Sequence, residues 1–214
     1  MIPMKQPVPE RRTVSLTELR IINPAVEDGQ EPIRPVIEGH AAVFNQWSDE
    51  LGYLFPFKER VLPGAFTESI QNDDVRALFN HDPNYVLGRN RSGTLDLMET
   101  EQGLLVRIHP PDTTWARDLH ISIDRGDISQ MSFGFLVLED RWGHEDGMDI
   151  RELRKVKLFD VSPVTFPAYP QTDVGIRGAL MSYASHQSEA TRARQMQMLS
   201  LKRRKLTISK EECY

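Results

Sequence analysis

Three residues of this chain have the types that a serine hydrolase needs, and each lies in a strand-like stretch: His81, Ser132 and Asp160. A serine can act as nucleophile, a histidine as general base, and a carboxylate as the group that orients the histidine. They occur in the order histidine, serine, acid, and no Gly-x-Ser-x-Gly elbow surrounds Ser132. This order and the missing elbow argue against α/β-hydrolases and subtilisins.

The elements expected around Ser132 and Asp160 form a hairpin. Residues 128–138 alternate so that Ser132 points away from the phenylalanines at 133 and 135. A polar, glycine-bounded loop over 143–149 precedes a second strand-like run over 154–164. If the turn centres near Asp146, antiparallel pairing brings Ser132 opposite Asp160 within a couple of residues.

Further elements follow from hydrophobic periodicity and turn residues. Alternation over 75–81 places His81 at a strand end, on the face of Val75 and Phe79. Glycine and asparagine predict a turn over 87–94. Helices are expected over 65–70 and 112–126, and other strands over 36–44, 53–61, 95–98 and 104–108.

Length and composition indicate one domain with two tails. The chain has 214 residues, of which 39% are hydrophobic, enough for a single core. Repeated prolines predict a flexible, extended arm over 1–35. Regular patterning starts at residue 36, and after residue 170 the pattern turns helical.

Charge and sequence patterning narrow the function classes. The net charge of −5 predicts no general affinity for nucleic acid or anionic membranes. No stretch approaches the roughly 20 apolar residues of a membrane span, and no signal peptide is visible, so we expect a soluble, unexported protein. Cys213, next to the last residue, argues against a thiol enzyme.

Several alternatives compete with the predicted triad. Asp82 and Glu59 are rivals to Asp160 as the orienting acid. The acidic cluster over 144–149 with His144 lacks the spacing of a zinc site, so we expect a solvated hairpin tip, no metal and no cofactor. The basic run over 192–205 lacks interleaved aromatics, which favours a solvated helix face or tail over a nucleic-acid site.

Five segments in this order and spacing resemble the prohead (capsid maturation) serine protease family of tailed bacteriophages, which is related to the herpesvirus assemblin proteases. The resemblance covers residues 36 to about 177, which implies a protease domain over 36–177 and a helical, basic tail over 178–214. It rests on the segments 38–44, 59–66, Phe79-Asn80-His81-Asp82 with 87–89, 126–128 with Met131-Ser132-Phe133-Gly134-Phe135, and 160–170.

The resemblance implies an α+β fold, a mostly antiparallel β-barrel surrounded by a few helices, as in herpesvirus proteases. It implies His81 as base and Ser132 as nucleophile. The family usually has a glutamate where Asp160 stands, and assemblins use a second histidine, so Asp160 is the departure from the pattern. Backbone amides over 162–166 are candidate oxyanion donors.

In family terms, the substrates would be the phage scaffold protein, the scaffold-like segment of the major capsid protein, and the protease itself. Cleavage would occur in the host cytoplasm, inside the immature procapsid. No nucleic acid or membrane partner is implied, and a homodimer is expected by analogy alone. The competing functions are a non-enzymatic capsid assembly factor on the same barrel and a β-barrel for small ligands, which would hold His81 and Ser132 far apart.

Overall fold

The computed structural model describes residues 9–14, 19–23, 34–52, 55–166, 179 and 182–187. The chain divides into two units, Met1–Gly178 and Ala179–Tyr214, and each is described by itself. In the second unit, residues 182–187 are helical, while the basic run 192–205 and Cys213 lie outside the described residues.

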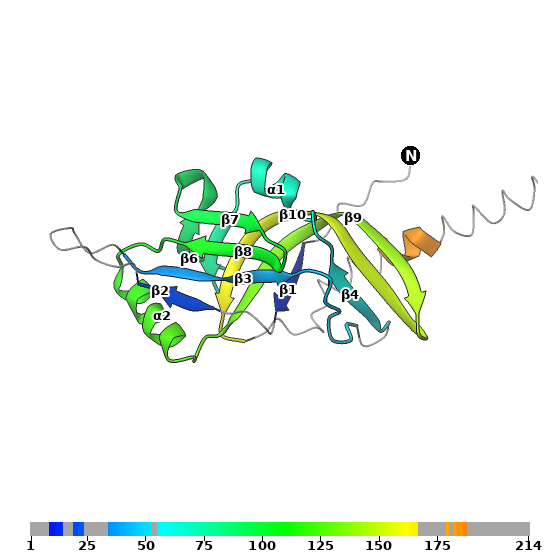
Figure 1. Cartoon of the computed structure of the whole chain (residues 1–214), viewed down its shortest axis with the longest axis horizontal. Helices are drawn as coiled ribbons and strands as arrows, with labels where there is room; N and C mark the ends of the chain where they lie inside the picture. The colour runs from blue at the N-terminus through cyan, green and yellow to red at the C-terminus, as the bar shows by residue number, and fades with distance from the viewer. Residues whose placement is uncertain are drawn as a thin grey trace, which may run out of the picture. The chain divides into compact units, whose positions relative to one another are not determined.

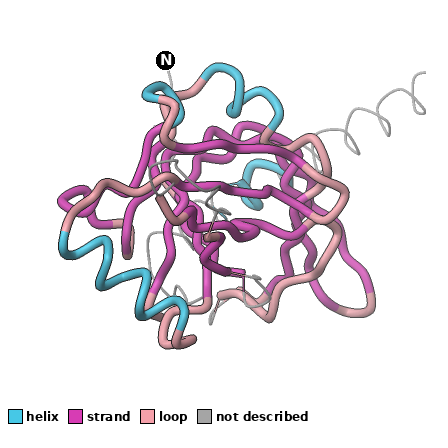
Figure 2. The backbone as a smooth tube through the Cα atoms, turned by 60° about the vertical axis from the view of Figure 1, so that its left-hand side comes forward, coloured by secondary structure: helices cyan, strands magenta, loops and turns pink. Residues whose placement is uncertain are grey.

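The first unit is built mainly from strands. Figure 2 shows these strands at the centre of the unit, with the helices on its periphery. The elements are β1 (Glu10–Val14), β2 (Arg20–Ile22), β3 (Val36–Val43), β4 (Phe57–Val61), α1 (Thr67–Asn72), β5 (Arg76–Phe79), β6 (Asp82–Arg89), the 3-10 helix η1 (Asn90–Ser92), β7 (Leu95–Glu99), β8 (Gly103–Ile108), α2 (Thr114–Asp124), β9 (Gln130–Glu145) and β10 (Met148–Val164). This confirms the predicted α+β class.

The strands form two sheets, so the β-barrel that the family resemblance implies is not closed. One sheet has the order β1-β9-β10-β5-β6, with β4 also paired to β10, and the other has the order β2-β3-β8-β7. Pairing is antiparallel throughout, except that β10 runs parallel to β4 and β5. The barrel stays open because β2 and β7, the edges of the smaller sheet, pair with no described strand of the larger one.

The hairpin of β9 and β10 dominates the larger sheet (Figure 1). Its turn contains only Asp146 and Gly147, both with positive φ, as two-residue hairpin turns require. The predicted loop over 143–149 is therefore mostly strand. The predicted turn over 87–94 is also partly wrong, because β6 runs to Arg89.

Aromatic packing ties β9 to the core. Phe133 stacks on Phe135 with ring centroids 4.8 Å apart and meets the edge of Phe66 at 5.5 Å. Met131, Phe133 and Phe135 are all buried, as the alternation predicts. The residues between them therefore face the other side of the sheet.

Two short strands lie within the segment predicted as an extended arm. β1 pairs with β9 and β2 pairs with β3, each antiparallel. The sheets of the first unit therefore include residues that precede position 36. No helix in the described part of the chain is long and apolar enough to cross a membrane.

Candidate active site

The three residues selected from the sequence come together at one point of the larger sheet. His81 Nε2 lies 2.8 Å from Ser132 Oγ, and His81 Nδ1 lies 2.5 Å from Asp160 Oδ1. The side chains of His81 and Asp160 are 7% and 13% exposed, and Ser132 is fully buried. This separation of His81 and Ser132 matches the prediction for a serine hydrolase and does not fit a ligand-binding barrel that keeps them apart.

His81 is positioned by a tight turn rather than by a strand. It is the second residue of the two-residue turn between β5 and β6, and both Asn80 and His81 have positive φ, at 54° and 57°. A left-handed histidine costs about 1–3 kcal/mol, so the surrounding contacts must hold it. Sequence alternation placed His81 on a strand face and missed this turn.

Parallel pairing of β5 with β10 brings that turn to the serine. The Asn80 amide N–H donates to the carbonyl of Pro163 at 3.0 Å. The Asn80 side chain accepts from the Thr165 amide at 2.8 Å and donates to Thr165 Oγ1 at 3.1 Å. The Thr165 amide, one of the candidate oxyanion donors, is thus engaged by Asn80.

Asp160 reaches His81 because the neighbouring strand leaves space for it. Asp160 lies opposite Gly134 in the β9–β10 register, two residues from Ser132. A Cβ atom at position 134 would collide with the Asp160 carboxylate, so glycine there lets the carboxylate occupy this position. Ser162, opposite Ser132, donates from Oγ to Asp160 Oδ1 at 2.8 Å. Sequence reasoning missed this role of Ser162.

The rival acids have other partners. The Asp82 carboxylate accepts hydrogen bonds from the amide and side chain of Asn84 at 2.8 Å. Glu59 accepts from Arg12 and Arg151. Of the three candidate acids, the structure therefore brings Asp160 to His81.

Strand β1 covers the serine. Ser132 lies opposite Thr13 in the β1–β9 register, and Ser132 Oγ donates to the carbonyl oxygen of Arg12 at 2.8 Å. A serine has one hydroxyl proton, so a proton directed at Arg12 is not available to His81. The structure therefore holds an assembled His–Ser pair beneath a strand that competes with the base.

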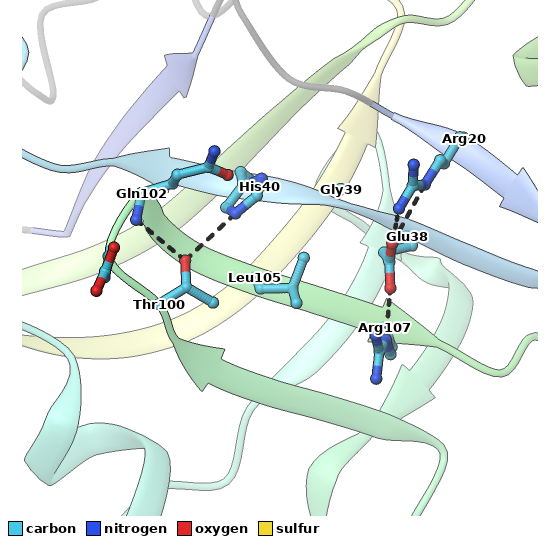
Figure 3. Close-up of a pocket in the computed structure, with 9 residues that line it drawn as sticks. Arg20, Glu38, Gly39, His40, Thr100, Gln102, Leu105 and Arg107 are labelled. Atoms are coloured by element: carbon cyan, nitrogen blue, oxygen red, sulfur yellow. Dashed lines mark hydrogen bonds and ion pairs between the residues drawn. The ribbon is translucent and has the colours of Figure 1, made fainter.

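Two other groups of polar side chains lie away from His81, Ser132 and Asp160. A pocket of about 470 Å³ lies on the smaller sheet, where Glu38 is bound by Arg20 and Arg107, and Thr100 contacts His40 (Figure 3). None of its lining residues belongs to the triad.

The β9–β10 tip carries the acidic cluster with His144, for which the sequence predicts a solvated tip and not a metal site. There His144 Nδ1 lies 2.8 Å from Asp149 Oδ1, and the His144 side chain is exposed. Among the described residues, no group of three or more histidine, cysteine or acidic side chains could hold a metal ion.

Comparison with known proteins places this geometry in a family. A family model described as caudovirus prohead serine protease matches residues 21–188. The prohead protease of Enterobacteria phage HK97 is 32% identical over 152 residues, covering 69% of this chain and 60% of the HK97 protein. The chain thus matches only part of the length of that relative.

A solved structure is also similar. The capsid assembly protease of bacteriophage T4, gp21, aligns with 74% of this chain and 99% of its own, at 16% identity and a TM-score of 0.45. The family model spans His81, Ser132 and Asp160 and well over half of the chain. This chain belongs to the caudovirus prohead serine protease family.

Proposed function

We propose that this chain is a serine endopeptidase with Ser132 as nucleophile, His81 as general base and Asp160 as the orienting acid. The observation that carries the proposal is the continuous contact from Asp160 through His81 to Ser132. Family membership supports the same activity.

The reaction follows from the positions of these atoms. Ser132 Oγ attacks the peptide carbonyl carbon while its proton passes to His81 Nε2, and Asp160 stabilises the imidazolium at Nδ1. The C–N bond breaks as His81 returns the proton to the leaving amine. Water then hydrolyses the acyl-serine by the same route and restores the hydroxyl. General acid–base catalysis of this kind typically contributes about 10²- to 10⁴-fold.

The proposed substrates are the phage scaffold protein, the scaffold-like segment of the major capsid protein, and the protease itself. We place the reaction inside the immature procapsid in the host cytoplasm, with no role for nucleic acid or membrane, and a homodimer stays a prediction. The relation of the two sheets to the barrel of herpesvirus assemblin proteases is part of the same proposal. The alternative is a non-enzymatic assembly factor on this scaffold, which would place no demand on the contact between His81 and Ser132.

The test is co-expression with the scaffold and capsid proteins. We expect the wild-type chain to process its partners, Ser132→Ala to leave them whole, and the matched control Ser122→Ala, on α2, to behave as wild type. A serine-directed fluorophosphonate should label the wild type and not Ser132→Ala. Equal processing by wild type and Ser132→Ala would remove Ser132 as the nucleophile.

A further proposal concerns the two ends of the chain. We propose that the segments 1–35 and 178–214, which flank the predicted core domain 36–177, dock the protease or are removed by self-cleavage. N-terminal sequencing and intact mass before and after maturation test this. If both ends stay whole, self-cleavage of the tails is excluded.

A further inference from the structure

Arg12 makes two kinds of contact at the candidate active site. Its carbonyl oxygen accepts the Ser132 hydroxyl, at 2.8 Å. Its guanidinium binds Glu59 through Nε at 2.7 Å and through a terminal nitrogen at 3.1 Å, and lies 5.6 Å from the centroid of the Phe135 ring. One residue therefore presents a carbonyl to the nucleophile and fills an acidic recess with its side chain.

The recess is lined by buried charged side chains. Glu59 is 3% exposed and Arg151 is 1% exposed, whereas the Arg12 side chain is 16% exposed. Arg151 donates to Glu59 at 3.0 Å and to Asp140 at 2.7 Å. The side chain of Arg12 thus enters from the partly open side of a cluster that the domain core supplies.

The charges favour one added cation. β1 contributes one acid, Glu10, and one base, Arg12, which pair with each other at 2.7 Å. Without β1, Glu59 loses both hydrogen bonds from Arg12 and shares Arg151 with Asp140. A buried carboxylate that loses a partner is costly, so the vacated recess has net attraction for a basic side chain.

The backbone of β1 shows how a peptide could bind. β1 is an edge strand that pairs antiparallel with β9 from Glu10 opposite Phe135 to Val14 opposite Met131. Adding an extended peptide to a sheet edge is a common mode of peptide recognition, in which side-chain pockets provide specificity. A peptide in the register of β1 would place the carbonyl of one residue at Ser132 and the side chain of that same residue in the recess.

We infer that the recess formed by Glu59, Phe135 and Arg151 is the subsite for the substrate residue whose carbonyl Ser132 attacks, that it selects arginine or lysine, and that Arg12 occupies it as an internal mimic. This inference rests on the proposed protease function. Substrate enters as a strand on β9 in place of β1. Glu59 is the specificity-determining residue.

The first experiment varies the substrate. Quenched fluorescent peptides copy residues 8–16 with arginine, lysine, citrulline or glutamate at the position of Arg12, and the enzyme is the full chain carrying Arg12→Gln, which weakens the hold of β1. Citrulline has the shape of arginine without its charge. We expect cleavage after arginine with a kcat/KM about 10- to 100-fold above that for citrulline, as for loss of a charged hydrogen bond.

The second experiment varies the recess. Glu59→Gln should bring the ratio of arginine to citrulline cleavage close to one. Glu38→Gln is the matched control, since Glu38 is equally buried and also bound by two arginines but lies on the smaller sheet, and it should keep the ratio. If Glu59→Gln fails to fold, peptide binding is measured on the chain that carries both Ser132→Ala and Arg12→Gln. In that chain, the arginine peptide should bind at least about tenfold more tightly than the citrulline peptide.

The third measurement tests whether Arg12 occupies the subsite and limits access to Ser132. Fluorophosphonate should label Ser132 faster in Arg12→Gln than in wild type, while Arg12→Lys stays near wild type. Equal labelling rates in all three would show that Arg12 does not close the site.

The outcomes separate this inference from the proposed function. If Ser132 is labelled or any peptide is cut, but arginine and citrulline react equally, the subsite assignment is overturned and the protease function stands. If there is no labelling, no peptide cleavage and no processing in co-expression, the protease function fails and the inference fails with it.

Discussion

Gly134→Ala tests whether the position of Asp160 matters for the reaction. The two residues lie opposite each other on β9 and β10, and an added methyl group would overlap the Asp160 carboxylate. That carboxylate is 2.5 Å from His81 Nδ1 and must move by roughly 1 Å to restore normal contact. The substitution therefore displaces Asp160, the proposed orienting acid, without changing any member of the proposed triad.

The expected loss follows from the size of that displacement. A misplacement of about 1 Å can cost about 10²-fold in rate, and wrong orientation of the histidine in a serine protease triad costs about 10⁴-fold. We expect kcat to fall by about 10²- to 10⁴-fold. The free energy of unfolding should change little, because the lower entropy of the unfolded alanine chain, worth about 0.4–1 kcal/mol, offsets part of the strain.

The assay is the rate of substrate processing and of fluorophosphonate labelling, with thermal unfolding measured in parallel. Gly143→Ala is the matched control on β9, because its methyl group would meet only the flexible Ile150 side chain, at 3.3 Å. In an Asp160→Ala background, Gly134→Ala should cause little further loss. Retention of kcat within about twofold of the Gly143→Ala variant would refute the role given to Asp160.

Three further predictions concern buried polar side chains outside the proposed triad. Ser162→Ala removes the hydroxyl that holds Asp160 and should lower kcat by about tenfold with KM unchanged, as steady-state kinetics can check. Arg151→Met leaves buried carboxylates uncompensated and should cost about 3–5 kcal/mol of stability in urea unfolding. Burial raises the pKa of Glu38, but hydrogen bonds from two arginines outweigh burial and hold the pKa below 4.5. That stabilisation is present above pH 4.5 and lost on acidification, so Glu38→Gln should lower Tm at pH 7 and weaken the dependence of Tm on pH below 4.5.

The sequence predicts the strand that carries Ser132 better than the segments that surround it. Alternation of Met131, Phe133 and Phe135 is a local signal, and it correctly assigns the buried face of β9. β6 was missed because its first half is exposed and lacks an apolar stripe, although Asn80 before it is a typical residue for a tight turn.

Strand β1 could not be predicted from local pattern. Its sequence, Glu10 to Val14, is dominated by charged residues, which in isolation indicates solvent-exposed chain. Glu10 is buried and Arg12 is mostly buried because Arg151 and Glu59, far along the chain, supply partners for them. Long-range charge pairing of this kind leaves no periodicity in the sequence.

The contact of Asp160 with His81 depends on an irregularity that simple alternation does not contain. In a regular strand, Leu158 and Asp160 would face the same side, and Leu158 lies opposite Phe135 on the buried face. A register shift between Leu158 and Asp160 leaves Phe159 as an extra residue and places Asp160 opposite Gly134 instead. Because a one-residue slip moves every later side chain to the other face, this bulge turns Asp160 toward the side of Ser132 and leaves Val161 in the core. The predicted hairpin therefore brought Ser132 and Asp160 close, but the bulge at Phe159 is what allows a carboxylate on β10 to reach His81 at all.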